Sequence, residues 1–147
     1  MVKLAVTLGD PAGIGPEVVD KALLRRHDAE ILVLGSRAGG GKEALAAIDE
    51  ALDLALAKKV DGIVTAPVSK ERIAKTGVPF VGHTEHLAAR AGTTLPVMMF
   101  VAGPLRVALA TTHVSLRKLP AMITPDRVLG ILRETSRGLR DYFGVFE

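Results

Sequence analysis

The sequence predicts an α/β protein with a mostly parallel sheet flanked by helices. Short aliphatic runs alternate with amphipathic stretches, an order typical of β-α-β units. One run, Gly62–Ala66, is continuously apolar, as expected of a strand that is covered on both faces. Hydrophobic residues make up 48% and charged residues 24% of the 147 residues, a balance typical of a globular domain. We therefore expect a single α/β domain over residues 1–147.

The first part of the chain predicts a strand, a turn, a helix and a second strand. Lys3–Leu8 is aliphatic, and the glycine-rich turn Gly9–Gly15 follows it. Pro16 suits the first position of a helix, which we expect to end at about Arg26. Glu30–Leu34 is the second short aliphatic run and the second predicted strand.

A long helix and the third strand are predicted next. Residues 36–41 (SRAGGG) are the one linker-like stretch, so we expect a flexible junction there. From Lys42 to Lys59 apolar residues recur at helical spacing, which indicates a long helix. The apolar run Gly62–Ala66 then predicts the third strand.

Two short helices are predicted after the third strand, each beginning at a hydroxyl side chain. Ser69 is expected to cap a helix that runs through Ala74. Thr84 is expected to cap another that runs through Ala91.

The C-terminal part predicts a hairpin and a helix. Pro96–Val101 and Leu105–Ala110 are two strands joined by a tight Ala-Gly-Pro turn, and we expect them to pair antiparallel. Residues 124–126 (Thr-Pro-Asp) are a strong start signal for the last helix, which we expect to reach about Tyr142.

Composition excludes several classes of function. Nineteen basic against sixteen acidic residues leave a net charge of only +3, and aromatic residues, at 3%, are too few to form stacking platforms. We therefore expect no nucleic-acid partner. The chain has no cysteine, so it forms no disulfide and has no thiolate chemistry. The N-terminal apolar run is too short for a signal peptide or a membrane span, so we expect a cytoplasmic protein without a membrane partner.

The glycine-rich turn is the first candidate site. It can direct backbone N–H groups and a helix N-terminus at an anion, or it can be only a tight strand-to-helix turn. It lacks the third glycine of a dinucleotide fingerprint and the Gly-Lys-Ser/Thr of a P-loop. Asp10 beside it is either a ligand or a turn-forming residue.

The second candidate is the segment Gly82-His83-Thr84-Glu85-His86 before a predicted helix. An imidazole and a hydroxyl at a helix N-terminus suit a phosphate, which makes His83 and Thr84 candidate ligands. His86 lies three residues after His83 and can share its helical face, although the HExxH pattern is absent. The alternative is that Thr84 only caps the helix and that His86 is exposed.

Two further candidates follow strands. His113, in Thr-Thr-His after the strand Leu105–Ala110, can bind a metal or act as an acid or base, or it can be structural. Lys70, after Gly62–Ala66, can neutralise a substrate anion or be solvated. His27 lies in a polar run and is expected to be solvated.

Four collinear stretches together give the sequence a specific resemblance. They are VTLGDPAGIGPEV, DGIVTAPVSKE, GVPFVGHTEHLA and LRVALATTHVSLRKLPAMIT. In this order they resemble the 4-hydroxythreonine-4-phosphate dehydrogenase family of pyridoxal phosphate biosynthesis. The resemblance covers nearly all of the chain except the segment around the glycines.

The resemblance implies part of an isocitrate/isopropylmalate-dehydrogenase-like fold and a homodimer or larger homo-oligomer. It implies oxidation of a small phosphorylated hydroxy acid by NAD or NADP, followed by loss of CO2. A divalent metal assists, with zinc expected and magnesium or cobalt as alternatives. On the matching motifs, His83 and Thr84 would contact substrate and His113 would be a metal ligand.

Against the family pattern the chain is short. It carries only SRAGGG where members have a substantial segment, and it lacks the second half, which holds two more metal-binding histidines. One alternative interpretation is therefore a catalytically inactive fragment or minimal self-associating domain of that family. Another is a relative that acts on threonate or erythronate 4-phosphate.

Overall fold

The computed structural model describes residues 1–146, and their contacts divide into two compact units. The first unit ends at Thr93 and the second begins at Thr94. Each unit is described by itself below. The single domain over 1–147 and the flexible junction at 36–41 stay predictions.

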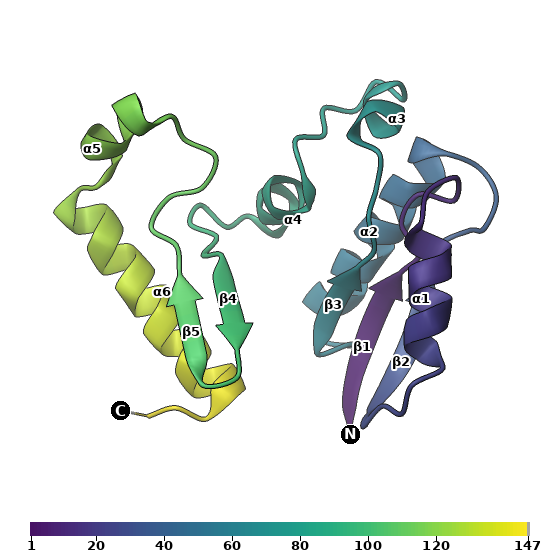
Figure 1. Ribbon diagram of the computed structural model, residues 1–147, viewed down its shortest axis with the longest axis horizontal. Coiled ribbons are helices and arrows are strands. Elements are labelled where there is room, and N and C mark those ends of the chain that lie inside the picture. Colours follow the sequence, from purple (N-terminus) through teal and green to yellow (C-terminus); the bar gives the residue numbers. More distant parts are fainter. Residues whose placement is uncertain (147) are drawn as a thin grey trace. The chain divides into compact units, whose positions relative to one another are not determined.

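The first unit is an α/β layer structure built on a parallel sheet, which confirms the predicted fold class (Figure 1). Its three strands lie in the order β2-β1-β3, so the N-terminal strand is central and pairs with both others. The elements of this unit are β1 (Val2–Thr7), α1 (Gly15–Leu23), β2 (Ala29–Leu34), α2 (Gly41–Leu56), β3 (Gly62–Thr65), α3 (Lys70–Ala74) and α4 (His83–Ala91).

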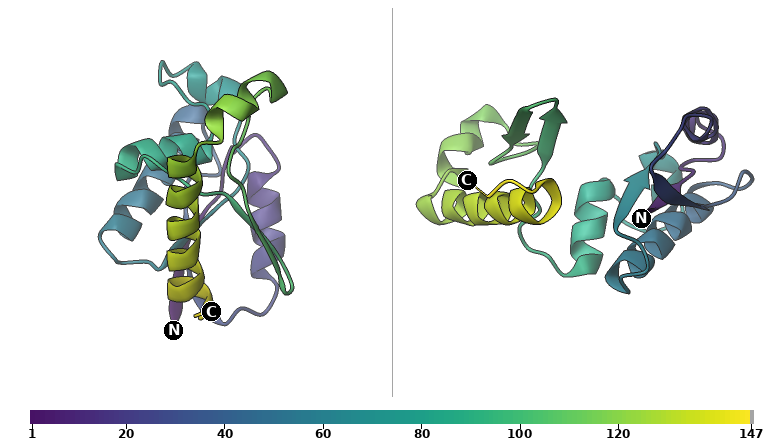
Figure 2. Two further views of the ribbon diagram at one scale, coloured as in Figure 1. Left: turned by 90° about the vertical axis from the view of Figure 1, so that its left-hand side faces the viewer. Right: turned by 90° about the horizontal axis from the view of Figure 1, so that it is seen from below.

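Alternate residues of β1 face two different helices, because successive side chains of a strand point to opposite faces of a sheet. Ala5 packs in a buried cluster with Ala47 and Ala51 of α2. Val6 packs with Val19 of α1 in a second cluster on the other face. The two helices therefore lie on opposite sides of the sheet, as the right-hand view in Figure 2 shows.

A third apolar cluster joins α2 to the short helix α3 and the segment before α4. Its buried members are Leu45, Ile48, Ile73 and Phe80. Gly41, the first residue of α2, lies directly against the backbone of Arg72, because a Cβ at Gly41 would lie 2.3 Å from that carbonyl oxygen. This close approach holds α3 next to the start of α2.

The second unit consists of a β-hairpin and helices. Strands β4 (Met99–Ala102) and β5 (Leu105–Ala108) pair antiparallel, as predicted. The helical elements that follow are the 3-10 turn η1 (Leu116–Lys118), α5 (Leu119–Met122) and α6 (Pro125–Phe143). Arg127 Nε of α6 donates to the carbonyl of Ala110, two residues after β5, at 3.0 Å, and the guanidinium of Arg106 on β5 lies 5.0 Å from the centre of the Phe143 ring of α6.

One of the two predicted hydroxyl caps, Ser69, is confirmed, and so is the predicted start of the last helix at residues 124–126. Ser69 accepts a hydrogen bond from the Arg72 N–H at the start of α3, and Thr124 accepts one from Arg127 at the start of α6. The prediction for Thr84 is wrong. Gly82 is the N-cap of α4, with extended backbone, so Thr84 is the second helical residue, and no side chain among those described caps this helix.

Three strands, β1, β3 and β5, end one or two residues earlier than predicted, whereas β2 ends at Leu34 as predicted and β4 is Met99–Ala102 instead of Pro96–Val101. β1 stops at Thr7, and β5 stops at Ala108. Among residues 1–146, no helix has both the length and the hydropathy needed to cross a membrane.

Candidate functional site

The glycine-rich turn after β1 uses its hydrogen-bonding groups inside the protein. The Asp10 N–H donates to the Pro67 carbonyl at 2.9 Å, and the Gly13 N–H donates to the Asp10 carbonyl. Gly9 has a φ of 72° and approaches Pro67 so closely that a Cβ would lie 2.3 Å from that carbonyl oxygen. Of the two interpretations of this segment, these contacts favour the tight strand-to-helix turn over an anion cradle.

Asp10 is buried and serves as a turn-forming residue. Its Oδ1 accepts a hydrogen bond from the Ala12 N–H at 3.0 Å, as in an Asx turn. The same oxygen lies 3.0 Å from Nη1 of Arg72 on α3. The Asp10 side chain is only 6% exposed, so this ion pair ties the glycine turn to α3 in a partly desolvated setting.

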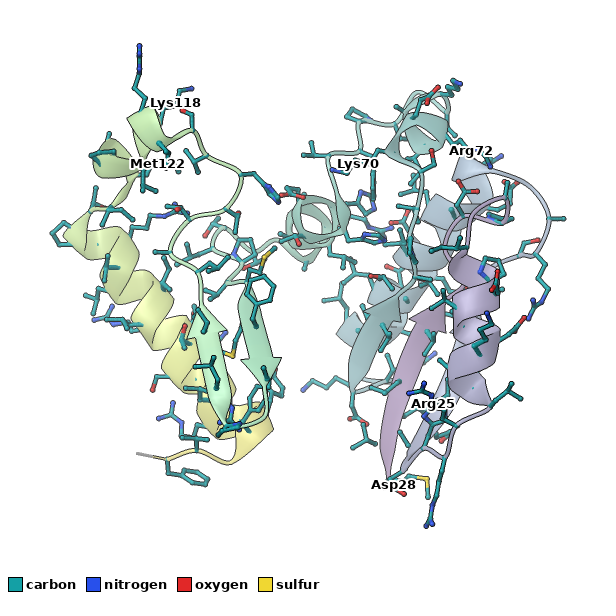
Figure 3. All side chains as sticks on the ribbon, in the orientation of Figure 1. Arg25, Asp28, Lys70, Arg72, Lys118 and Met122 are labelled. Carbon is teal, nitrogen blue, oxygen red and sulfur yellow. The ribbon has the colours of Figure 1, made fainter. Side chains whose placement is uncertain are left out.

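Lys70 and Arg72 lie at the end of the sheet where β1 and β3 finish, opposite Arg25 and Asp28 (Figure 3). Ligands of open α/β sheets bind outside the carboxyl ends of the strands. Lys70 is exposed, as one of its two interpretations expected. Its position in the fold still brings a cation to that end of the sheet.

Lys70 also lies beside the start of α4. A Cβ at Gly82 would lie 3.8 Å from the Lys70 ammonium nitrogen and 2.8 Å from a carboxylate oxygen of Glu85. The structure thus brings together two segments that the sequence offered as separate candidates. We call Lys70, Gly82, His83 and Thr84 the α4 cluster.

The first turn of α4 supplies hydrogen-bond donors to this cluster. The first intrahelical bond runs from the His86 N–H to the Gly82 carbonyl, at 3.1 Å. The N–H groups of His83 and Thr84 precede it and have no partner within the helix. Helix N-termini of this kind attract anions, since the N–H groups and the helix dipole both favour negative charge.

His83 is half-buried at this terminus. Its ring lies edge-on to Phe80 with the ring centres 5.8 Å apart. Burial lowers the pKa of His83, and the nearby His86 and the Lys70 ammonium lower it further. Among residues 1–146 no group hydrogen-bonds its buried Nε2. A buried polar nitrogen without a partner is costly, so this atom is suited to receive a ligand group.

His86 is not exposed, which contradicts the expectation that accompanied the cap interpretation of Thr84. Its side chain is 13% exposed, and Nε2 lies 2.6 Å from Oδ1 of Asp49 on α2. Its ring also contacts Phe80, with centres 5.5 Å apart, so His83 and His86 do share one face of the helix against that ring. No local signal announces the contact with Asp49, because 37 residues separate the two.

His113 belongs to the second unit and follows β5. It is exposed, and its φ of 55° lies in the left-handed region, which few residues other than glycine adopt. Strained backbone of this kind is concentrated at functional sites. His27, in the first unit, is exposed as predicted, and its Nε2 lies 2.9 Å from the Ala22 carbonyl.

The donor set does not fit the divalent metal that the resemblance implies. Catalytic zinc requires three protein ligands with an open position. Within the described part of the chain, no group of three His, Cys, Asp or Glu side chains is arranged to hold a metal ion. His113 alone cannot provide such a site.

The fold and the α4 cluster define an α/β protein whose candidate site lies at the carboxyl end of a parallel sheet. A sequence family described as "Pyridoxal phosphate biosynthetic protein PdxA" matches residues 19–147. The chain therefore belongs to the PdxA family.

Named relatives and solved structures agree with this family. A 4-hydroxythreonine-4-phosphate dehydrogenase of Burkholderia vietnamiensis is 38% identical over 190 residues, covering 98% of this chain and 58% of the relative. The corresponding protein of Chromobacterium violaceum is 35% identical over 189 residues, covering 97% and 58%. The crystal structure of the Klebsiella pneumoniae enzyme has a TM-score of 0.86 at 28% identity, covering 95% of this chain and 60% of that one.

The chain spans about three-fifths of the length of the relatives it matches. The alignment of 190 residues is longer than the 147 residues of this chain. The matched part of the relative therefore includes residues that have no counterpart here. This agrees with the expectation that an internal segment is absent.

Proposed function

We propose that this chain supplies the substrate-binding residues of a 4-hydroxythreonine-4-phosphate dehydrogenase. The observation that carries the proposal is the α4 cluster, where the buried Nε2 of His83 has no partner among the described residues. The family and the names of the relatives support the substrate class, a small phosphorylated hydroxy acid.

Each member of the cluster has a role that its chemistry allows. Lys70 contributes positive charge beside the helix N-terminus. Thr84 contributes a hydroxyl that both donates and accepts. His83 is neutral near pH 7 because its pKa is lowered, so its imidazole offers one donor and one acceptor nitrogen. Together they suit a substrate anion that must be held in one orientation.

We propose that NAD or NADP oxidises the hydroxyl group of the bound substrate and that the resulting 3-oxo acid then loses CO2. His113 is proposed as a ligand of the divalent metal, zinc in the first instance. Because the described residues do not complete a metal site, the remaining ligands must come from outside these residues.

A binding experiment tests the proposal directly. Phosphate should stabilise the 147-residue chain by mass action, by about 2.7 kcal/mol at a concentration one hundred times the dissociation constant. The shift in melting temperature should disappear in the double variant His83→Ala, Thr84→Ala. Sulfate serves as a second anion, and chloride at equal ionic strength controls for charge screening. A melting temperature that does not rise when phosphate is added would contradict the proposal.

A turnover experiment tests the role of His113 and the metal. These 147 residues by themselves should reduce no NAD or NADP with 4-phosphohydroxythreonine and zinc. The physical reason is that a metal held by one histidine cannot activate a hydroxyl at neutral pH. Robust NAD(P)H formation that a chelator and His113→Ala both abolish would overturn this expectation.

We also propose a cytoplasmic homodimer or larger homo-oligomer. Within residues 1–146, no further strand pairs with the outer edges of β2 and β3, and Val33 and Val64 on these strands are more than one-third exposed. Exposed strand edges and apolar side chains are normally covered by a partner. Light scattering at micromolar concentration should give a mass above the 15.5 kDa of one chain. A mass of one chain would count against self-association.

A further inference from the structure

Asp49 on α2 contacts two side chains of α4. Its Oδ1 lies 2.6 Å from Nε2 of His86 and 2.7 Å from Nη1 of Arg90. An ionised carboxylate only accepts hydrogen bonds, so His86 donates through Nε2–H. Since His86 and Arg90 are four residues apart on one helix face, one carboxylate holds two successive turns of α4.

A second acidic residue of α2, Asp53, also contacts α4, but more weakly. Asp53 lies one turn after Asp49 and pairs with Nη2 of Arg90 at 2.9 Å. Its side chain is 64% exposed, against 30% for Asp49. Solvent screens exposed pairs, so Asp49 dominates the polar connection between the two helices.

Helix α4 has little apolar anchoring that could replace this connection. None of its nine residues, all of which the structure describes, is fully buried. Leu87 is its one hydrophobic residue that packs against the third apolar cluster, and the rings of His83 and His86 contact Phe80 of that cluster. The orientation of so short a helix therefore depends strongly on its polar contacts.

The position of His86 also bears on His83. Both imidazoles contact the buried ring of Phe80, one edge-on and the other tilted, with centres 5.8 and 5.5 Å away. A change in the His86 ring therefore alters the packing surface and the electrostatic environment of His83.

We propose that Asp49 is a positioning residue for His83: by holding His86 and Arg90, it fixes α4 against α2 and keeps the His83 imidazole in place beside Phe80. What His83 binds rests on the proposed function. The placement of the ring does not, because it can be measured without any ligand.

Imidazole NMR of the chain labelled with 15N-histidine tests the placement. In Asp49→Asn the ring signals of His83 should shift, although Asp49 does not contact His83. In the matched control Asp53→Asn, which loses only the second contact to Arg90, they should stay where they are. His83 signals that are unchanged in Asp49→Asn, with a lowered melting temperature, would overturn the proposal and leave Asp49 a purely stabilising role.

A double-variant cycle tests the route through His86. His86→Phe keeps an aromatic ring against Phe80 but cannot donate to Asp49. It should shift the His83 signals as Asp49→Asn does, and adding Asp49→Asn to it should produce a much smaller further shift. Two independent, additive shifts would contradict the route. If Asp49→Asn does not fold, Asp49→Glu replaces it in the same NMR comparison, since it keeps the charge but moves the carboxylate away from its position beside His86 and Arg90.

Phosphate affinity gives a second readout. Asp49→Asn should weaken inorganic phosphate binding about threefold or more, the effect of losing one partly buried hydrogen bond. Asp53→Asn should leave it unchanged. If the unaltered chain does not bind phosphate at all, the proposed function fails, while the NMR signals of His83 still decide the role of Asp49.

Discussion

Asp10 and Arg72, 62 residues apart in the sequence, form a 3.0 Å ion pair that joins the glycine-rich turn to α3. Lys70 begins that helix, so the pair also helps to set the position of the cation in the α4 cluster. The turn contributes to the candidate site by holding α3, since its own N–H groups at Asp10, Ala12 and Gly13 bond inside the protein.

Replacing Asp10 should weaken both the fold and the site. Asp10→Ala removes the hydrogen bond to the Ala12 N–H and the partner of Arg72, and should cost about 1–3 kcal/mol of unfolding free energy. Urea denaturation measures this cost. Asp20→Asn is the control, because its pair with Arg37 is exposed and should matter little. Equal effects of the two variants would contradict the importance of burial.

Gly41→Ala should separate α2 from α3. The added Cβ would lie 2.3 Å from backbone atoms of Arg72, and backbone cannot yield as a flexible side chain can. We expect a loss of about 1–3 kcal/mol, typical of an overpacked site. Gly40→Ala is the control, since among the described residues nothing lies within 4 Å of its added Cβ. Thermal melting of both variants makes the comparison, and a fully stable Gly41→Ala would refute the contact.

Thr7→Val should stabilise the protein. The Thr7 side chain is completely buried, and its hydroxyl has no partner in the part of the chain that the structure describes. Valine keeps the shape and removes the unsatisfied group, so a gain of about 1 kcal/mol is expected. The same substitution at Thr76, whose hydroxyl donates to the Ile73 carbonyl at 2.7 Å, should give a loss instead. Urea midpoints with the same sign at both positions would contradict the argument.

His83 should make stability depend on pH. Its pKa is lowered in the folded chain from the ordinary value of 6.5, mainly by burial and then by His86 and Lys70. As the pH falls below 6.5, His83 binds a proton in the unfolded chain but not yet in the folded chain. The free energy of unfolding therefore decreases until the pH reaches the lowered pKa of folded His83.

The comparison with His83→Gln isolates this effect. Gln does not titrate, so the variant should lose less stability than the unaltered chain between neutral pH and the lowered pKa of His83. Urea unfolding in a phosphate-free buffer series measures the difference. Parallel stability curves for the two proteins would show that His83 titrates alike in both states.

The order of most helices and strands could be predicted because a local sequence signal marks where each begins or ends. Aliphatic runs are bounded by glycine or proline, and Ser69 and Thr124 stand where a hydroxyl can reach the N–H three residues later. The short turn and helix at η1 and α5 carry no comparable signal and were not expected. The prediction that Thr84 caps α4 failed because Gly82, which has no side chain, occupies the N-cap position.

The composition of the site could be predicted only in part. His83 and Thr84 were proposed as candidates from their place before a helix, which is a local feature. The approach of Lys70 to Gly82 and the contact between His86 and Asp49 arise from tertiary packing over longer separations. No spacing rule within one segment reports such contacts.

The central place of β1 has a consequence for how the chain is made. Val2 is paired with Ala29, and Leu4 with Gly62, so β1 is synthesised before both of the strands that it pairs with, and its second edge is covered only after β3 has been made. Until β3 emerges, one edge of β1 stays open while synthesis proceeds residue by residue. Non-local parallel pairing of this kind is slow to form. We therefore expect nascent chains that end before β3 to bind chaperones and to be cut readily by proteases, and chains that extend past Thr65 to become resistant.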